Sequence, residues 1–303
     1  MGVISTGNFA KALLPGINAW FGDEYKEHPE VYSKIFDVSS SDRNYEEDVL
    51  MSGLGLAKIK PEGSAVSYDD MGQGYTKRYT HVTRANGFIV TREMIEDNQA
   101  EVRAEKMTRA LKRGMIQTRE IVAANVLNRA FSSSYLGGDG VELSSSVHPT
   151  LAQDLRNELT TPADLSEAAL EQAFIDLGDF RDNRGLRMSA KGMKLVIPKE
   201  LEFIAHRILK SNLRVSVSDN DANAIKDMGM LPGGIVVNHH LTDTDAWFIK
   251  TDVADGLKYL DRRPLSIESD NDFDTFNAKF LASMRFTIGW TDPRGIFCSE
   301  GAA

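Results

Sequence analysis

Residues 91–131 constrain the fold most, because this stretch contains no proline and a single glycine, Gly114. Thr91 is a suitable N-cap, and acidic side chains follow it, where the helix dipole favours them. Its apolar residues recur at close to the helical period and are Met94, Ala110, Leu111, Met115, Val122, Val126 and Phe131. We therefore predict one helix of about 40 residues, roughly 60 Å long. The stripe forms no clean heptads, so a helix that supports other layers is favoured over a coiled coil.

Composition narrows the class of protein. A chain of 303 residues that is 42% hydrophobic can form one large domain or two smaller ones with real cores. The single cysteine, Cys298, excludes an internal disulfide and favours a reducing compartment. No segment approaches the roughly 18 apolar residues of a membrane helix. A net charge of −9 argues against sequence-specific DNA binding, which normally requires a basic face.

Residues 1–50 have neither helical nor strand periodicity beyond short runs at 9–14 and 29–36. They nevertheless contain large apolar side chains between glycines and prolines, namely Phe9, Leu13, Leu14, Trp20, Phe21, Tyr25, Tyr32, Ile35 and Phe36. A disordered tail would be poor in aromatic residues. We therefore expect an arm that is buried against another surface.

Residues 51–90 are predicted to form a long hairpin whose turn lies at residues 69–74, around Gly72 and Gly74. In the return strand, one face consists of Tyr75, Lys77, Tyr79, His81 and Thr83. Neither face is apolar enough to form a core, and a two-stranded ribbon is marginal by itself. The hairpin is therefore expected to project and contact another subunit. An edge hairpin that lies over its own domain is the alternative.

Residues 150–255 are predicted to form a compact α/β unit. Its elements are helices at 165–180 and 199–209, with strands at 193–198, 233–238 and around Trp247 to Ile249. Residues 256–297 are predicted to form three strands separated by an acidic loop at 269–274, which pair back beside the long helix. The fold class is therefore α+β.

Three clusters of polar residues are candidates for a catalytic or metal-binding site, but none has the pattern that such a site requires. Ser144–Ser146 lie close to His148, which leaves a cytosolic hydrolase as an alternative, but there is no G-x-S-x-G turn. The neighbouring His239 and His240 would point to opposite faces of a strand and cannot easily share a metal ion with Asp243 and Asp245. The acidic loop at 269–274 lacks the glycine and glutamate offsets of a calcium loop. We therefore predict no catalytic, cofactor-binding or metal-binding residue and no enzymatic activity.

The order of the parts carries more weight than any single motif. An irregular arm, a projecting hairpin, a very long helix, an α/β insertion and returning strands resemble the major capsid proteins of tailed bacteriophages with the Hong Kong 97 fold. Local stretches strengthen the resemblance. They are ANVLNRAFSSSYLGGDGVELSSSVHP at 124–149, KLVIPKELEFIAHRIL at 194–209, HLTDTDAWFI at 240–249 and WTDPRGIF at 290–297.

The resemblance implies a role for each part. Residues 1–50 would be the N-terminal arm, 51–90 the E-loop hairpin, 91–149 the P domain with its spine helix, 150–255 the A domain, and 256–303 the returning P-domain strands and loop. Expected subunit contacts, from the two extensions and the acidic loop, are Trp20, Phe21, Tyr68, Met71, Tyr75, Tyr79, Asp270, Asp272 and Asp274.

The same resemblance implies the partners. The chain would form pentamers and hexamers of an icosahedral virion capsid, assembled in the host cytoplasm around double-stranded DNA that it binds without sequence specificity. A separate scaffolding protein, a portal and cement proteins would accompany it, and no membrane or cofactor would be involved. An encapsulin-like nanocompartment with a protein cargo is the alternative of the same fold, and an adaptor or filament is the alternative of another class.

Overall fold

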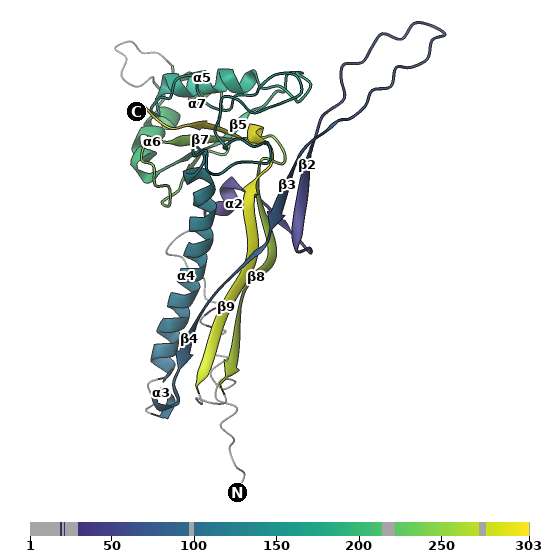
Figure 1. Cartoon of the computed structure of the whole chain (residues 1–303). Coiled ribbons are helices and arrows are strands. Elements are labelled where there is room, and N and C mark those ends of the chain that lie inside the picture. The colour runs from purple at the N-terminus through teal and green to yellow at the C-terminus, as the bar shows by residue number, and fades with distance from the viewer. Residues whose placement is uncertain are drawn as a thin grey trace.

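The computed structural model describes residues 19, 21, 30–96, 100–213, 222–272 and 277–302. The chain is elongated, with two long strands beside a long helix, a small helix-covered sheet at one end, and a ribbon that projects away from both (Figure 1). Helices and strands both contribute to the core, so the mixed fold class is confirmed. No helix among the described residues has the length and apolar character needed to cross a bilayer.

The long stretch forms α3 (Arg92–Glu96) and α4 (Ala100–Asn128), the latter with 29 residues. Thr91 accepts a hydrogen bond from the Met94 amide at 3.4 Å, as expected of an N-cap. The helix ends at Asn128, three residues before the predicted end, where the chain turns toward a serine-rich segment. The buried positions of α4 recur at Ala104, Thr108, Leu111, Met115, Ala123, Ala124 and Leu127. Ala110 is exposed, because it lies one residue off this stripe.

The long sheet packs against α4 and has the order β1-β8-β9-β4. Its strands are β1 (Asp37–Ser40), β4 (Val82–Val90), β8 (Leu257–Asn271) and β9 (Ala278–Trp290). Every second residue of β9 is buried from Ala278 to Phe286, which is the period of a strand with a core face. The three strands predicted within 256–297 are present as β8, β9 and β10 (Ile296–Ser299), but β8 continues to Asn271 and so includes the start of the range predicted as the acidic loop.

The projecting ribbon consists of β2 (Tyr45–Met51) and β3 (Gln73–Thr80), which pair antiparallel. Its first strand therefore begins within the range predicted as the arm, and β4 leaves the ribbon for the long sheet. The predicted turn at 69–74 is wrong. Ser52 and Gly72 close the base of the loop, with the Ser52 amide donating to the Gly72 carbonyl at 2.9 Å. The described turn of the loop lies at Pro61 to Ser64, where Gly63 has a φ of 78°.

The second sheet has the order β10-β7-β5-β6. Its strands are β5 (Gly192–Ile197), β6 (Ile235–Val237), β7 (Trp247–Thr251) and β10 (Ile296–Ser299), and its helices are α5 (Glu167–Gly178), η2 (Lys199–Leu201), α6 (Glu202–Lys210) and α7 (Ala224–Asp227). The predicted α/β unit is therefore present, but its edge strand comes from the end of the chain. The assignment of all of 256–303 to the other domain is wrong at β10, which follows η3 (Pro293–Gly295) and pairs with β7.

Both faces of this second sheet are buried, and alternate residues belong to different cores. Leu195, Trp247 and Phe297 face the cluster beneath α5 and α6, whereas Val196 and Phe248 join the cluster that contains Leu127 of α4 and the long sheet. A sheet covered on both faces needs apolar residues at consecutive positions. The long helix and the α/β unit therefore share one continuous core.

The end of the arm also belongs to this core. The helix α2 (Tyr32–Ile35) starts where Glu120 of α4 accepts hydrogen bonds from the Val31 amide at 3.1 Å and the Tyr32 amide at 3.0 Å. The guanidinium of Arg119 lies 4.4 Å from the centre of the Tyr32 ring and pairs with Glu30. A carboxylate from the long helix thus supplies the N-terminal cap that the local sequence of α2 lacks.

Candidate functional site

The loop between β2 and β3 is a solvated surface that carries several apolar side chains. Residues 53–71 include no buried residue. The exposed fraction is 77% for Leu56, 95% for Ile59 and 92% for Tyr68, and Leu54, Val66 and Met71 are also exposed. Scattered exposed apolar residues are common, but their concentration on one projecting loop indicates an interaction site. In Figure 1 this loop extends well beyond the rest of the chain.

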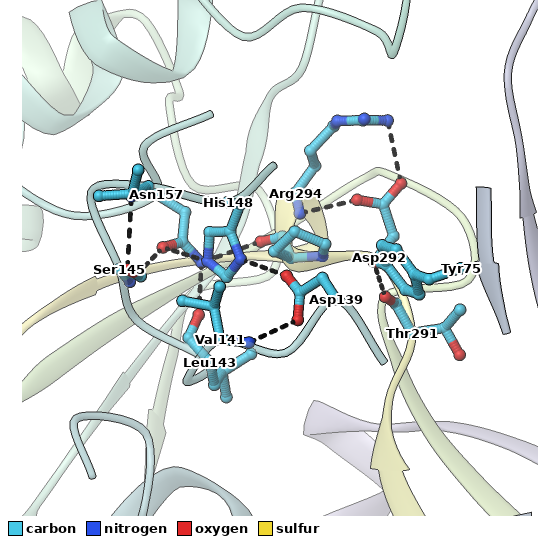
Figure 2. Close-up of polar contacts among 12 residues, drawn as sticks. Tyr75, Asp139, Val141, Leu143, Ser145, His148, Asn157, Thr291, Asp292 and Arg294 are labelled. Atoms are coloured by element: carbon cyan, nitrogen blue, oxygen red, sulfur yellow. Dashed lines mark hydrogen bonds and ion pairs between the residues drawn. The ribbon is translucent and has the colours of Figure 1, made fainter. Parts of the chain in front are cut away.

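The base of the ribbon is fixed to its own body by Thr291, which follows β9. The hydroxyl of Tyr75 donates to the Thr291 carbonyl at 2.6 Å, and the Tyr79 hydroxyl lies 2.5 Å from Thr291 Oγ1 (Figure 2 shows the Tyr75 contact). Thr291 Oγ1 donates to Asp48 of β2 at 2.9 Å, and Asp48 also pairs with Lys258 at 2.6 Å. Burial raises the pKa of both tyrosines, so both remain hydrogen-bond donors at any physiological pH.

A glycine makes this close approach possible. The ring of Tyr79 lies over Gly289 of β9, where an added Cβ would be 2.7 Å from the ring. On the predicted face, Tyr79 and His81 are buried and Tyr75 and Lys77 are half-buried, whereas Thr83, which lies in β4, is exposed. For the base of the ribbon, the edge hairpin that lies over its own domain is therefore the correct alternative. The projecting part is the loop beyond it.

The ribbon meets the long sheet at His81, the one residue between β3 and β4. Its Nε2 lies 2.9 Å from Ser41 Oγ, and that hydroxyl donates to Glu46 at 2.8 Å. Ser41 therefore accepts from His81, which places the ring proton on Nε2. Burial lowers the pKa of His81, and the positive charge of Arg285 and Arg262 lowers it further, against the opposing effect of Glu46 and Asp261. The junction between the ribbon and the long sheet thus contains a buried neutral imidazole.

The segment after α4 joins the α/β unit through His148 and Asn157. His148 Nδ1 lies 2.6 Å from Asp139, and Nε2 lies 3.3 Å from Asn157 Oδ1 (Figure 2). The Asn157 amide nitrogen donates to the carbonyls of Leu143 at 2.7 Å and Pro293 at 3.1 Å, so Oδ1 can only accept. This network joins three distant parts of the chain, and all of its side chains are buried.

That geometry does not form a hydrolytic triad. His148 Nε2 faces Asn157 Oδ1 at 3.3 Å, and no serine hydroxyl among the described residues is a hydrogen-bond partner of the imidazole. Ser144 Oγ donates to Glu158 at 2.9 Å, away from the imidazole. The hydrolase alternative is therefore contradicted at the residues that suggested it. Among the described residues, no group of three His, Cys, Asp or Glu side chains is arranged to hold a metal ion.

The turn at η3 is held by a second buried pair. Arg294 Nη1 lies 3.2 Å from Asp292 Oδ2, the Arg294 amide donates to Asp292 Oδ1 at 2.9 Å, and Nη2 donates to Asn183 (the Asp292 contacts are drawn in Figure 2). Burial raises the pKa of Asp292, whereas the charge of Arg294 lowers it. This pair fixes the chain between β9 and β10, where it passes from one sheet to the other.

The structure separates the predicted contact residues into groups. Tyr68 and Met71 lie on the exposed loop. Phe21 packs against the main core, and both Tyr75 and Tyr79 bond to Thr291 of their own chain. Their role as subunit contacts stays a prediction. A side chain that is 3% exposed, as Tyr79 is, offers almost no surface to a neighbour.

The acidic loop is only partly described. Asp270 is exposed at the end of β8, and Asp272 pairs with Lys279 of β9 at 2.6 Å. Trp20 and Asp274 lie outside the described residues. As subunit contacts, Tyr68, Met71, Asp270 and Asp272 stay predictions.

Sequence reasoning missed the residues that hold the two extensions. Asp48 and Thr291 are 243 positions apart, and Glu120 and Tyr32 are 88 apart. Each is a single polar residue with no local motif. The one available signal was a glutamate within an otherwise apolar part of the α4 stripe, at Glu120.

The sequence of this chain can be compared with those of known protein families. A model of the family described as phage capsid protein matches residues 74–299, more than half of the chain. The chain belongs to the phage capsid protein family. It is therefore a structural protein of a phage head, as the resemblance in its sequence implied. No curated protein sequence matches this capsid protein.

Solved structures similar to this capsid protein extend the match to nearly the whole chain. A protein of Mycobacterium phage Che8 has 17% identity and a TM-score of 0.53, covering 92% of this chain and 94% of its own. The mature capsid of bacteriophage PhiM1 has 13% identity and a TM-score of 0.53, covering 91% and 88%. A virus-like particle from Pyrococcus furiosus has 13% identity and a TM-score of 0.51, covering 95% and 96%. These likenesses show the fold, and the Hong Kong 97-like fold is confirmed.

Proposed function

We propose that this protein is the repeating subunit of an icosahedral shell, built from pentamers and hexamers, that encloses double-stranded phage DNA. The observation that supports this proposal most strongly is that the loop at residues 53–71 is solvated in the single chain although it displays apolar side chains. The membership of the phage capsid family supports the same conclusion. Assembly in the host cytoplasm, with a scaffolding protein, a portal and possible cement proteins, belongs to this proposal.

The loop has enough apolar surface to drive association. Burying the side chains of Leu56, Ile59 and Tyr68 against a neighbour would contribute roughly 5–9 kcal/mol before the entropic cost of association is subtracted. One subunit in a closed shell contacts several neighbours, so modest pairwise contacts add. The ribbon base, fixed by Tyr75 and Tyr79, would hold the loop at a defined angle for that contact.

The proposed division of labour follows the two sheets. The long sheet and α4 form the P domain, and the sheet β10-β7-β5-β6 with its helices forms the A domain, which would cluster at the five-fold and six-fold axes. Residues before Val31 and the ribbon form the extensions. Because the two sheets share a core through α4, they would move together during maturation, while the ribbon turns about His81.

The experiment removes the loop without disturbing its base. Since Ser52 and Gly72 face each other across the ribbon, residues 53–71 can be replaced by the dipeptide Asn-Gly, which forms a tight hairpin turn. We expect a folded subunit with wild-type thermal stability that forms no closed particles in electron micrographs. Normal shells from this variant would contradict the role of the loop.

A nanocompartment that stores protein cargo is the second candidate. The similarity to the virus-like particle from Pyrococcus furiosus, over 95% of this chain, favours keeping it. Purified particles distinguish the two. Shells that contain nuclease-protected DNA support the phage head, whereas shells filled with a second protein and free of DNA support the compartment.

A further inference from the structure

A cavity of about 410 Å³ lies between the ribbon base, α4 and β9. Its lining includes the apolar side chains of Val122, Val126 and Trp290 together with four cationic side chains. The lining contains no Asp or Glu among the described residues. This is unexpected in a chain with 44 acidic and 35 basic residues. We call this cavity the cationic pocket.

Three of its cations have no carboxylate partner among the described residues. Lys77 Nζ donates to the Leu136 carbonyl at 3.2 Å, Arg129 lies 4.2 Å from the centre of the Tyr135 ring, and Arg84 lies 4.4 Å from that of Phe286. Arg84 Nη1 is buried without a hydrogen-bond partner. Arg78, the fourth cation of the lining, pairs with Glu47 on the outer face. The pocket is therefore short of negative charge.

Burial is already unfavourable for two of these charges. It lowers the pKa of Lys77 and of Arg84, which means that the surroundings disfavour their charged forms. Asp139 opposes the shift at Lys77, but its carboxylate is bonded to His148 and to the Val141 amide. A half-buried cation without a partner is costly, and such costs concentrate where a ligand completes the site.

We propose that the cationic pocket receives an acidic side chain from a second copy of this chain. This inference rests on the proposed function, because assembly supplies the second copy. A carboxylate fits a recess of this size, whereas a nucleic acid duplex cannot enter it. Another copy carries 44 acidic against 35 basic side chains and so offers carboxylates in excess. The pocket would thus orient the neighbour beside the ribbon base and leave the loop free for its own contact.

The direct test is a zero-length crosslink in assembled shells. Isotope-labelled and unlabelled chains are mixed before assembly, and the shells are treated with a carbodiimide, which joins a lysine amine to a carboxylate only when the two touch. We expect Lys77 to be joined to an Asp or Glu of the other isotope. Shells in which Lys77 is joined only within its own chain, or to nothing, would overturn this inference alone. A chain that forms no shells would overturn the proposed function and this inference together.

A variant that lacks two of the charges tests the same contact without a crosslinking reagent. Lys77→Met combined with Arg129→Gln should leave the thermal unfolding of the free subunit unchanged. It should raise the concentration for half-maximal assembly about ten-fold and weaken its dependence on salt. The matched control is Arg187→Gln, since Arg187 pairs with Asp179 at the surface at 3.2 Å and is not part of the pocket lining. Assembly equal to that control, or a loss of packaged nucleic acid with normal assembly, would overturn the inference.

Discussion

Replacing Glu120 tests how the arm is fastened to the long helix. Its carboxylate is 3% exposed and is the acceptor for the amides of Val31 and Tyr32 at the start of α2. Glu120→Ala leaves both amides buried without a partner, which should cost about 2–4 kcal/mol of unfolding free energy. Glu120→Gln keeps one acceptor and should cost about half of that. The loss should be global, because Val31, Tyr32, Ile35 and Phe36 are part of the main core.

The assay is equilibrium unfolding of the unassembled subunit in urea, with the free energy taken from the linear extrapolation. Trypsin cleavage after the exposed Lys34 reports release of α2 in the same samples. The matched control is Glu105→Ala, because Glu105 lies on the same helix but pairs with Arg109 at 2.8 Å near the surface, a contact worth less than about 1 kcal/mol. If Glu120→Ala were as stable and as resistant to trypsin as this control, the hydrogen bonds of Glu120 to α2 would contribute nothing to the stability of the subunit.

Three further changes probe the ribbon and the junction of the two sheets. Tyr79→Phe removes one hydrogen bond to Thr291 and should cost about 1 kcal/mol in urea unfolding; a neutral result would mean that Asp48 and Tyr75 hold Thr291 without it. Asn157→Asp turns a carboxylate toward backbone carbonyls and should cost about 3–5 kcal/mol, seen as a lower melting temperature; an unchanged one would contradict the network. Because the pKa of His81 is lowered in the folded state, the unfolded chain binds a proton first as the pH falls. Stability should therefore decline below a pH of about 6.5, and His81→Gln should reduce that slope; an equal slope would mean that other groups cause it.

Elements with a strong local period were predictable from the sequence. The long helix, the helix at α5 and the buried strand β5 were found within a few residues, because each depends on neighbours in the chain. The strand β10 was assigned to the wrong sheet, because its pairing with β7 depends on residues about fifty positions away. Periodicity identifies a strand but does not identify its partner.

The ribbon shows why turn signals mislead. Residues 69–74 contain the aspartates and glycines of a turn, but these residues have other uses. Asp69 accepts from the Gly55 amide at 2.6 Å and pairs with Arg184 at 2.8 Å, while Gly72 bonds to Ser52. The hydrogen bonds that Asp69 accepts from the Gly55 amide and from Arg184 also lower the pKa of its carboxyl. Turn residues close the base of the loop here, and the turn of the loop uses Pro61 to Ser64.

The candidate interface was predictable in kind but not in detail. The alternation of the two faces of the return strand was recognised, and Tyr68, one of the expected contacts, lies exposed on the loop. The division between residues that anchor the ribbon and residues that face outward was not visible, since it depends on Thr291 and Gly289 at the far end of the chain. Distant polar partners decide which aromatic residues are left for a neighbour.

The most direct measurement is the mass distribution of the purified wild-type chain as its concentration is raised, with electron microscopy of the same samples. We predict a cooperative transition from the 33.6 kDa subunit to closed particles of uniform size. A compact monomer at every concentration, with protease-resistant residues 53–71, would contradict it.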